Sequence, residues 1–311
     1  MLIFMKVHRD IDHLPVFQNA VITIGTFDGV HQGHQKIIEN LKQEAEKING
    51  ETVIITFHPH PRKVVSSAIL GIRLINTLQE KIELLDKNGI DHLVVVPFTE
   101  VFANQPAEDY VKNFLAEKFH PHTIIIGYDH RFGRDRLGDY HLLEKMANEY
   151  HYTIREIPKH VLDEIAISST NIREAIVHGD IDTANKLLGY DFFFEGVVVH
   201  GDKLGRKLGY PTANLKITDD EKIHLGNGIY AVYADVDGKH KKGMMSIGFR
   251  PTVDGKKRVI EVNIFDFDKE IYGQSIRVYV KKYLRPEIKF DSIDDLVKQI
   301  GQDKIESLKI L

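Results

Sequence analysis

The sequence predicts two domains of different class: an α/β domain with a mostly parallel sheet, then an antiparallel β-barrel that ends in a C-terminal helix. Up to about residue 190, short apolar runs alternate with helical stretches, as in strands joined by crossover helices. Beyond that point apolar runs follow one another with few helices, and turn signals such as Asp237-Gly238 separate them. The 311 residues suffice for about two domains, which we expect at 1–188 and 189–311.

Composition narrows the class of protein. Hydrophobic residues make up 42% and charged residues 28%, as in a well-cored globular protein, and no apolar run approaches the ~18 residues that span a membrane. The N-terminus has no secretion-signal pattern, and the absence of cysteine fits a reducing cytoplasm. A net charge of −4 argues against a dominant nucleic-acid-binding role. We therefore expect a cytoplasmic protein without nucleic-acid or membrane partners; its oligomeric state is not determined by these features.

The elements expected in the first domain follow from hydrophobic periodicity. Runs that are apolar and short are expected to be strands, at 2–7, 20–24, 52–57, 92–96, 123–126 and 152–157. Stretches with an apolar residue every three or four positions are expected to be helices, at 34–48, 78–88, 107–119 and 140–150. In such a sheet, ligands bind beyond the carboxyl ends of the strands.

The second domain is expected to consist mostly of strands, at 192–199, 228–236, 241–246, 259–265 and 275–283. Asp237-Gly238 and Asp254-Gly255 are strong hairpin signals, and the basic stretches beside them are expected to be solvated hairpin tips. Residues 292–311 are expected to form an amphipathic helix whose apolar stripe contains Ile293, Leu296, Ile300 and Leu308. These features indicate a compact antiparallel barrel covered by one helix.

The first candidate site is the stretch 23–35, a strand, a glycine-rich turn and a helix start. The regular structure is interrupted between strand and helix by Gly25, Asp28, Gly29 and Gly33. Free N–H groups and the helix dipole at such a start favour phosphate. His31 and His34 could donate hydrogen bonds there and, if protonated, add positive charge. A helix cap with two solvated histidines explains the spacing equally well, whereas no nearby acidic or cysteine ligand completes a zinc site.

Three further stretches of the first domain carry candidate residues. One strand is followed by Phe57-His58-Pro59-His60-Pro61-Arg62. This stretch could be a rigid loop or could form the wall of a ligand pocket. The stretch from Gly127 to Gly133 follows a strand and is rich in turn residues. Ser168-Ser169-Thr170-Asn171-Ile172-Arg173 opens a helix, where hydroxyl side chains serve as caps and could also bind an anion.

The second domain has a glycine-rich stretch that ends in Pro211-Thr212-Ala213-Asn214. Because Pro211 forbids an immediate helix, we expect a phosphate-cradling loop within β-structure, although a glycine-rich barrel corner fits the pattern as well. Thr212 and Asn214 offer the hard oxygen ligands that Mg²⁺ prefers. Further on, Glu261 and Asn263 alternate with apolar residues and share one strand face, which could be solvated or could line a pocket.

The stretch Ile24-Gly25-Thr26-Phe27-Asp28-Gly29-Val30-His31-Gln32-Gly33-His34 resembles the signature of the bacterial bifunctional riboflavin kinase/FMN adenylyltransferase family, also called FAD synthetase. It corresponds to the His-x-Gly-His phosphate motif of nucleotidyltransferases. The family's Ile-Ser-Ser-Thr-x-Ile-Arg, Pro-Thr-x-Asn and Leu-Arg-Pro-Glu motifs also have counterparts here. The resemblance implies a Rossmann-like nucleotidyltransferase domain at 1–188 and a riboflavin kinase barrel at 189–311.

The resemblance also implies roles for individual residues. Catalytic roles fall to Glu261, as general base of the kinase, and to His31, His34 and Arg173. In the first domain, residues implied in binding flavin or ATP are Gly25, Phe27, Asp28, Gly29, Gly33, Pro59, Asp129, Phe132, Ser168, Ser169 and Thr170. In the second they are Gly201, Gly205, Arg206, Gly209, Pro211, Thr212, Asn214 and Arg285, with Thr212 and Asn214 as Mg²⁺ ligands. Two positions depart from the family pattern, since His130 replaces a usual Phe and Asn263 a usual His.

The implied function is the phosphorylation of riboflavin to FMN by ATP, followed by adenylylation of FMN to FAD with release of pyrophosphate. ATP and Mg²⁺ would be needed, with FMN and FAD as product and substrate. One alternative is a monofunctional FMN adenylyltransferase whose barrel only binds flavin or regulates. A second is a flavin-sensing regulator, which a basic, aromatic surface would favour; the sequence shows none.

Overall fold

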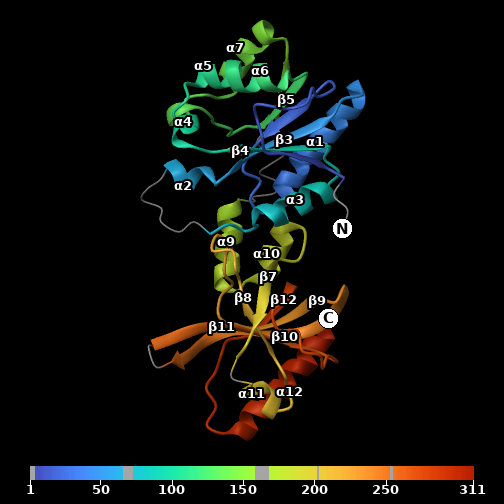
Figure 1. The fold of residues 1–311 in the computed structure, drawn as a ribbon, viewed down its shortest axis with the longest axis vertical. Helices are drawn as coiled ribbons and strands as arrows, with labels where there is room; N and C mark the ends of the chain where they lie inside the picture. Colours follow the sequence, from blue (N-terminus) through green and yellow to red (C-terminus); the bar gives the residue numbers. More distant parts are fainter. Residues whose placement is uncertain (1–3, 66–72, 158–167, 202, 253–254) are drawn as a thin grey trace. The chain divides into compact units, whose positions relative to one another are not determined.

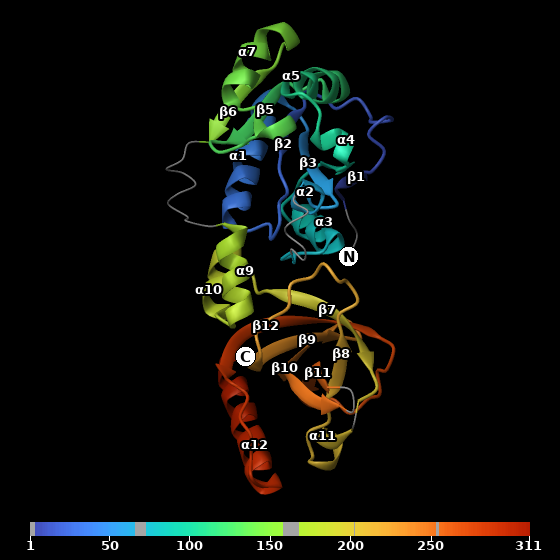
Figure 2. The same cartoon turned by 90° about the vertical axis from the view of Figure 1, so that its left-hand side faces the viewer.

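A computed structural model describes residues 4–65, 73–157, 168–201, 203–252 and 255–311 of the chain (Figures 1 and 2). It divides into two compact units, Met1–Ser169 and Thr170–Leu311. The first is a three-layer α/β unit and the second a closed barrel with helices. The predicted fold class is therefore confirmed.

The first unit is built on a six-stranded, all-parallel sheet of order β1-β4-β3-β2-β5-β6. Its strands agree with the predicted runs to within a few residues: β1 (Lys6–His8), β2 (Val21–Ile24), β3 (Thr52–His58), β4 (His92–Pro97), β5 (Thr123–Gly127) and β6 (Thr153–Ile157). The four central strands are almost wholly buried, because helices cover both faces of a parallel sheet.

The longer helices cross between successive parallel strands. Figure 1 shows α1 and α3 on one face of the sheet and α5 to α7 on the other. The bounds are α1 (Gln32–Ile48), α2 (Pro61–Val65), α3 (Leu78–Lys87), α4 (Glu100–Ala103), α5 (Ala107–Asp109), η1 (Tyr110–Ala116), α6 (Glu117–Phe119), η2 (Arg134–Arg136) and α7 (Tyr140–Tyr150). The predicted helix 107–119 is present, but its middle, η1, has π-helical hydrogen bonding. The core of one face joins alternate strand residues such as Ile22 and Val94 to Phe114 and Leu143.

The strand order reverses beside β2, and this fixes where a ligand can bind. β2 pairs with β3 on one side and with β5 on the other. The helices after β2 and β5 leave in opposite directions, so the loops after these strands part and leave a crevice at their carboxyl ends. The loops at this point are 25–31 and 128–138, two of the stretches that the sequence analysis singled out.

The second unit is a closed barrel of strand order β10-β11-β8-β7-β12-β9 with antiparallel neighbours. Its elements are α9 (Ser169–His178, whose first residue closes the first unit), α10 (Ile181–Leu188), β7 (Phe193–Val199), α11 (Leu204–Lys207), β8 (Ala213–Lys216), β9 (Gly228–Val236), β10 (Lys239–Thr252), β11 (Gly255–Ile264), β12 (Ser275–Arg285) and α12 (Ile293–Ile310). The Asp237-Gly238 hairpin is confirmed, with φ of 51° and 70° at its two turn residues. The other expected hairpin lies partly outside the described residues.

The sequence analysis missed three elements of this unit. The short helix α11 lies within the stretch expected to be a loop, and the strand β8 begins at Ala213, inside the Pro-Thr-Ala-Asn motif. The helix α10 precedes the barrel and packs on it, with Ala184 and Leu188 fully buried. Each of these elements is short, so it gives little periodic signal of its own.

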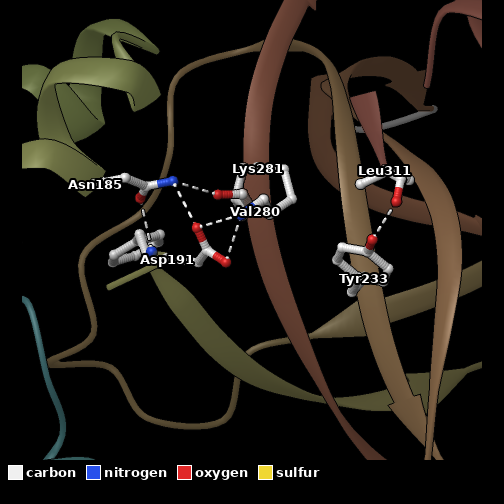
Figure 3. Close-up of polar contacts among 7 residues, drawn as sticks. Asn185, Asp191, Tyr233, Val280, Lys281 and Leu311 are labelled. Carbon is white, nitrogen blue, oxygen red and sulfur yellow. Dashed lines mark hydrogen bonds and ion pairs between the residues drawn. The ribbon is translucent and has the colours of Figure 1, made fainter. Parts of the chain in front are cut away.

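A side-chain amide ties α10 to the barrel strands (Figure 3). Asn185 Oδ1 accepts from the backbone N–H of Phe192 at 2.7 Å, and its Nδ2 donates to the carbonyl of Val280 at 2.9 Å. Beside it, Lys281 Nζ lies 2.8 Å from both carboxylate oxygens of Asp191. The helix therefore satisfies backbone groups of the barrel and is part of its fold.

The C-terminal helix α12 is present, but its expected apolar stripe is only partly buried: Leu296 and Ile300 are half-buried, whereas the other two residues are exposed. Ile293 is 64% and Leu308 43% exposed, whereas Asp303 and Ser307 are buried. Asp303 is paired on both oxygens with the Arg285 guanidinium, at 2.8 and 2.6 Å. The helix thus docks on β9, β10 and β12 through a face that includes polar residues. Near its end, the Tyr233 hydroxyl donates to the Leu311 carbonyl at 2.5 Å (Figure 3).

Candidate functional site

The turn after β2 has an unusual backbone. Phe27 and Val30 have positive φ of 48° and 36°, a conformation that costs free energy for side chains of this size, and Gly29 has φ of 91°. Both nonglycine residues are almost completely buried. Their packing holds the turn in a shape that the chain would not choose locally, which is typical of a binding site.

Asp28 holds this turn to the segment before α3. Its Oδ1 accepts from the backbone N–H groups of Ile75 at 2.9 Å and Asn76 at 3.3 Å, and the residue is 1% exposed. The sequence analysis expected Asp28 to bind a substrate. The structure gives its carboxylate a role within the protein, which is to brace the turn.

His31 is the N-cap of α1. Its Nδ1 accepts from the backbone N–H of His34 at 3.3 Å, so this nitrogen carries no proton and the proton lies on Nε2. The ring lies close over Gly33, where an added Cβ would come within 3.2 Å of the imidazole. A larger residue at position 33 would push the ring away, which explains the glycine between the two histidines.

His34 stacks on His31 with ring centroids 3.7 Å apart and planes 16° apart. Burial lowers the pKa of His34 well below its ordinary value, and His31 and Lys81 lower it further. Its buried Nδ1 has no hydrogen-bond partner among the described residues, so a charged ring would leave a buried N–H unsatisfied. Two charges at such a separation would repel by about 1 kcal/mol even in bulk water. Burial and the neighbouring positive groups therefore favour a neutral His34, so this ring offers a hydrogen-bond donor rather than the positive charge expected of it.

One hydrogen bond joins the serine-rich stretch to the same turn. Ser169, the first residue of α9, donates from its hydroxyl to the Asp28 carbonyl at 3.0 Å. Ser169, from the predicted stretch 168–173, thus meets the predicted stretch 23–35 within the first unit. Ser168 and Thr170 are exposed, and Arg173 follows Ser169 by about one helical turn.

The loop after β5 combines an exposed acid with buried rings. Asp129 is exposed, whereas the Phe132 ring is buried and stacks on Tyr110 at 5.0 Å. Burial lowers the pKa of His130 to about 4, so this imidazole is neutral near pH 7. Tyr110 was missed by the sequence analysis; it lies at the start of η1, and π-helical turns frequently mark functional sites. Burial also raises the pKa of its hydroxyl.

The loop after β3, expected to be a rigid loop or a pocket wall, is short and leads directly into a helix. Pro59, preceded by a cis peptide bond, is exposed, and the helix α2 begins already at Pro61. His60 is buried and its Nδ1 accepts from the backbone N–H of Arg62 at 3.2 Å. The prolines thus form a capped helix start at the carboxyl edge of the sheet.

The barrel brings two polar side chains to Glu261. Thr212 Oγ1 donates to Glu261 Oε1 at 3.3 Å, and the Arg250 guanidinium pairs with Glu261 Oε2. The carboxylate is only 16% exposed, so its orientation is fixed from both sides. Arg250 was missed because it lies on β10, eleven residues away in sequence but across the antiparallel β10–β11 pair in space. An arginine before Pro251 carries no sequence signal of its own.

Asn214 and Asn263 complete this end of the barrel. Asn214 lies opposite Glu261 in the β8–β11 pair. Asn263 is buried and its Nδ2 donates to the Pro211 carbonyl at 2.6 Å. The Asn263 amide therefore hydrogen-bonds the backbone of the Pro-Thr-Ala-Asn segment rather than the Glu261 carboxylate. Asparagine at this position thus has a structural role of its own.

The donor set around Glu261 fits a magnesium ion. The hydroxyl of Thr212, the amide oxygen of Asn214 and a carboxylate are hard oxygen ligands, and Mg²⁺ is commonly held by few protein groups together with substrate phosphates. Among the described residues there is no group of three or more histidine, cysteine or acidic side chains that could hold a metal alone. A metal here would therefore be completed by the phosphates of ATP.

The remaining predicted residues of the barrel divide into two groups. Arg206 pairs with Glu270 at 3.2 Å on the surface, and Arg285 is engaged by Asp303, so neither guanidinium is simply exposed to a ligand. Gly201 and Gly209 lie on either side of the short helix α11, and Gly205 lies within it. At Gly205 a Cβ would collide with the Tyr210 carbonyl, so the close backbone approach there requires glycine.

Two family models match the chain: FAD synthetase over residues 14–171 and riboflavin kinase over residues 188–311. Curated relatives named bifunctional riboflavin kinase/FMN adenylyltransferase match almost the full length. The Listeria monocytogenes protein is 38% identical, with 92% of this chain and 90% of that protein covered. The Buchnera aphidicola protein from Schizaphis graminum is 39% identical, with 98% of each covered.

A solved structure shares the whole fold. A crystal structure described as a macrolide-efflux protein from Streptococcus pneumoniae is 30% identical, covers 98% of this chain and 99% of its own, and gives a TM-score of 0.87. Its name concerns transport, but none of the helices described here is long and apolar enough to cross a membrane. The family models and the named relatives agree with each other and with the geometry of both sites, and this chain belongs to the bifunctional riboflavin kinase/FMN adenylyltransferase family.

Proposed function

We propose that this chain converts riboflavin to FMN and FMN to FAD, with ATP as the second substrate of both steps. The observation that carries the proposal is that each unit keeps a complete polar constellation of its own. The turn at His31 and His34 lies at the switch point of the parallel sheet, and Glu261 is gripped by Thr212 and Arg250 in the barrel. A barrel that only bound flavin would have no use for an oriented carboxylate.

In the kinase step, Glu261 acts as the general base. The riboflavin 5′-hydroxyl is a weak nucleophile near pH 7, so it must lose its proton as it attacks the γ-phosphorus of ATP. The phosphorus–oxygen bond to ADP breaks as the new bond forms, and the proton passes to the carboxylate. Arg250 and Thr212 hold the carboxylate in place, while Thr212 and Asn214 would hold Mg²⁺. When bound, that ion would neutralise phosphate charge.

In the adenylylation step no base is needed, because the FMN phosphate is already an anion that attacks the α-phosphorus of ATP. The site must position the two substrates and stabilise the charge that builds on the phosphates. The Nε2–H groups of His31 and His34 and the backbone N–H groups at the start of α1 are donors of the required kind. Arg173 adds a planar fork of donors suited to phosphate oxygens.

We assign FMN adenylyltransferase activity to the parallel-sheet unit and riboflavin kinase activity to the barrel together with α10, so the boundary lies before α10 rather than at the expected 188/189. The implied binding residues keep the roles expected from the resemblance, with Asp28 acting through the turn rather than on the substrate. We further propose a cytoplasmic enzyme whose partners are its small-molecule substrates, without nucleic acid. A monofunctional adenylyltransferase remains the rival, and the geometry at Glu261 favours the bifunctional enzyme over it.

The test is to incubate the full chain with riboflavin, ATP and Mg²⁺ and to separate the flavins by chromatography. FMN and FAD together support the proposal, and FAD made only from supplied FMN supports the monofunctional rival. The double variant His31→Ala/His34→Ala should still make FMN but no FAD. Its matched control is His13→Ala/His141→Ala, which removes two exposed imidazoles elsewhere in the same unit. Loss of both activities in a folded His31→Ala/His34→Ala protein would contradict the division between the units.

A further inference from the structure

A buried lysine lies behind the turn of the first unit, and the mechanism above does not use it. Lys81 is on α3 and only 5% exposed. Its Nζ donates to the Thr26 carbonyl at 2.7 Å and lies 3.4 Å from Thr56 Oγ1. Burying an ammonium group costs free energy unless the group is hydrogen-bonded. Its location next to residues 25–31 suggests what it does there.

The lysine and Asp28 hold the turn to α3 from two points. Thr26 precedes the positive-φ residue Phe27, and its carbonyl accepts from both Lys81 and the Thr56 hydroxyl, the latter at 3.2 Å. The Asp28 carboxylate binds the backbone just before α3. The start of α3 is itself fixed by a capping box between Thr77 and Glu80. A rigid helix thus sets the position of the turn.

The ammonium also acts on the electrostatics of His34. Lys81 is one of the charges that lower the pKa of this imidazole, after burial and the neighbouring His31. Among the described residues, the Phe27 ring also lies against this imidazole, with ring centroids 4.9 Å apart, and it carries no charge. A positive charge behind the turn therefore favours a neutral His34.

We propose that Lys81 is a positioning residue for adenylylation, which fixes the turn through Thr26 and places a positive charge behind the two histidines. This inference rests on the proposed function of the first unit. It assigns the fixed positive charge of the site to the lysine and the hydrogen-bond donors to the histidines. Such a division suits the reaction, because a preorganised charge behind the turn attracts phosphates without having to be protonated at each turnover.

The experiment compares Lys81→Met with Lys42→Met in the full chain. Lys42 is a half-buried lysine that also donates to a backbone carbonyl, that of Asn88 at 3.1 Å, but it lies away from the turn. Adenylylation of FMN should fall about tenfold or more in Lys81→Met, less than the 10²–10³-fold lost with a donor that touches the developing charge. Lys42→Met should be unchanged, and both variants should phosphorylate riboflavin at the wild-type rate.

A second readout separates positioning from a purely structural role. The proton titration of His34, followed by NMR in the full chain, should move to higher pH in Lys81→Met and stay in place in Lys42→Met. Lys81→Arg keeps the charge, so it should leave the His34 titration close to that of the wild type and lose less adenylylation than Lys81→Met. This variant also serves if Lys81→Met fails to fold.

The outcomes are distinguishable. A wild-type chain that makes no FAD from FMN refutes the proposed function, whatever the lysine does. A wild-type chain that makes FAD, with equal rates and equal His34 titrations in Lys81→Met and Lys42→Met, overturns the inference alone. Equal losses in Lys81→Arg and Lys81→Met, with no movement of the His34 titration in either, also overturn it.

Discussion

The amide of Asn185 offers a quantitative test of how the second unit is held together. Asn185→Ala leaves the backbone N–H of Phe192 and the carbonyl of Val280 without the partners that lie 2.7 and 2.9 Å away. Both residues are fully buried, and a buried backbone group left unsatisfied costs about 1–3 kcal/mol. Because Asn185 itself is only half-buried, water can reach part of the gap. We therefore expect a loss of about 2–4 kcal/mol rather than the full sum.

Hydrogen exchange of the full chain measures this loss where it occurs. At about 1.4 kcal/mol per tenfold change, the Phe192 amide should exchange about 30 to 1,000 times faster if it exchanges through opening of the barrel. Peptides covering β7 and β12 should report the change, and peptides from β2 in the first unit provide the internal reference.

The neighbouring ion pair supplies the control. Lys281→Met removes the 2.8 Å contacts with Asp191, but both side chains are about one third exposed. Such pairs contribute about 0–1 kcal/mol, so exchange should rise less than about fivefold. If Asn185→Ala and Lys281→Met accelerate exchange equally, the amide does not hold α10 to the barrel and the reasoning fails.

Four further predictions follow from the same contacts. A fragment of residues 170–311 should be soluble and should phosphorylate riboflavin. The shorter fragment 190–311 lacks α10 and should be recovered unfolded, so a stable and active 190–311 fragment would contradict this prediction. Glu261→Gln should slow riboflavin phosphorylation about 10²–10⁴-fold in steady-state assays and spare FAD formation from FMN; a wild-type rate of chemistry excludes the base role. Arg173→Lys should weaken adenylylation about tenfold despite keeping its charge, since the fork is lost, and unchanged kinetics would make Arg173 a surface residue. Between pH 6.5 and 4 the unfolded chain binds a proton at His130 that the folded chain excludes. The free energy of unfolding should therefore fall by up to about 3 kcal/mol as the pH is lowered through this range. In urea titrations, His130→Gln should lack this pH-dependent loss of stability.

The strands of the first unit could be predicted because their signal is local. A parallel strand buried on both faces is a short apolar run, and Val21–Ile24 and Thr123–Gly127 are such runs between polar segments. The alternation of strands and helices also predicted that ligands bind beyond the carboxyl ends of the strands, whereas the position of the switch point comes from the pairing of β2 with β3 and β5. The location of His31 and His34 at the start of α1 was therefore visible in the sequence.

The chemistry of those histidines was not visible, because it depends on what surrounds them. Burial, the neighbouring His31 and Lys81, which lies about fifty residues further along the chain, all lower the pKa of His34. The face of α12 was only partly predicted, for a related reason. Periodicity detects an amphipathic helix but does not say which face docks, and here the Arg285–Asp303 pair draws polar residues inward.

At the kinase site, the functional side chains are brought together by the pairing register of the strands rather than by one sequence motif. The alternation around Glu261 predicted its strand face, but Thr212 and Arg250 reach it from the loop before β8 and from β10. They meet only because β11 pairs with β8 on one side and β10 on the other, with Asn214 directly opposite Glu261. A slip of one residue would place Val262 at that position and turn the carboxylate to the other face. Closure of the barrel, which removes both sheet edges, is what fixes this register and therefore the site.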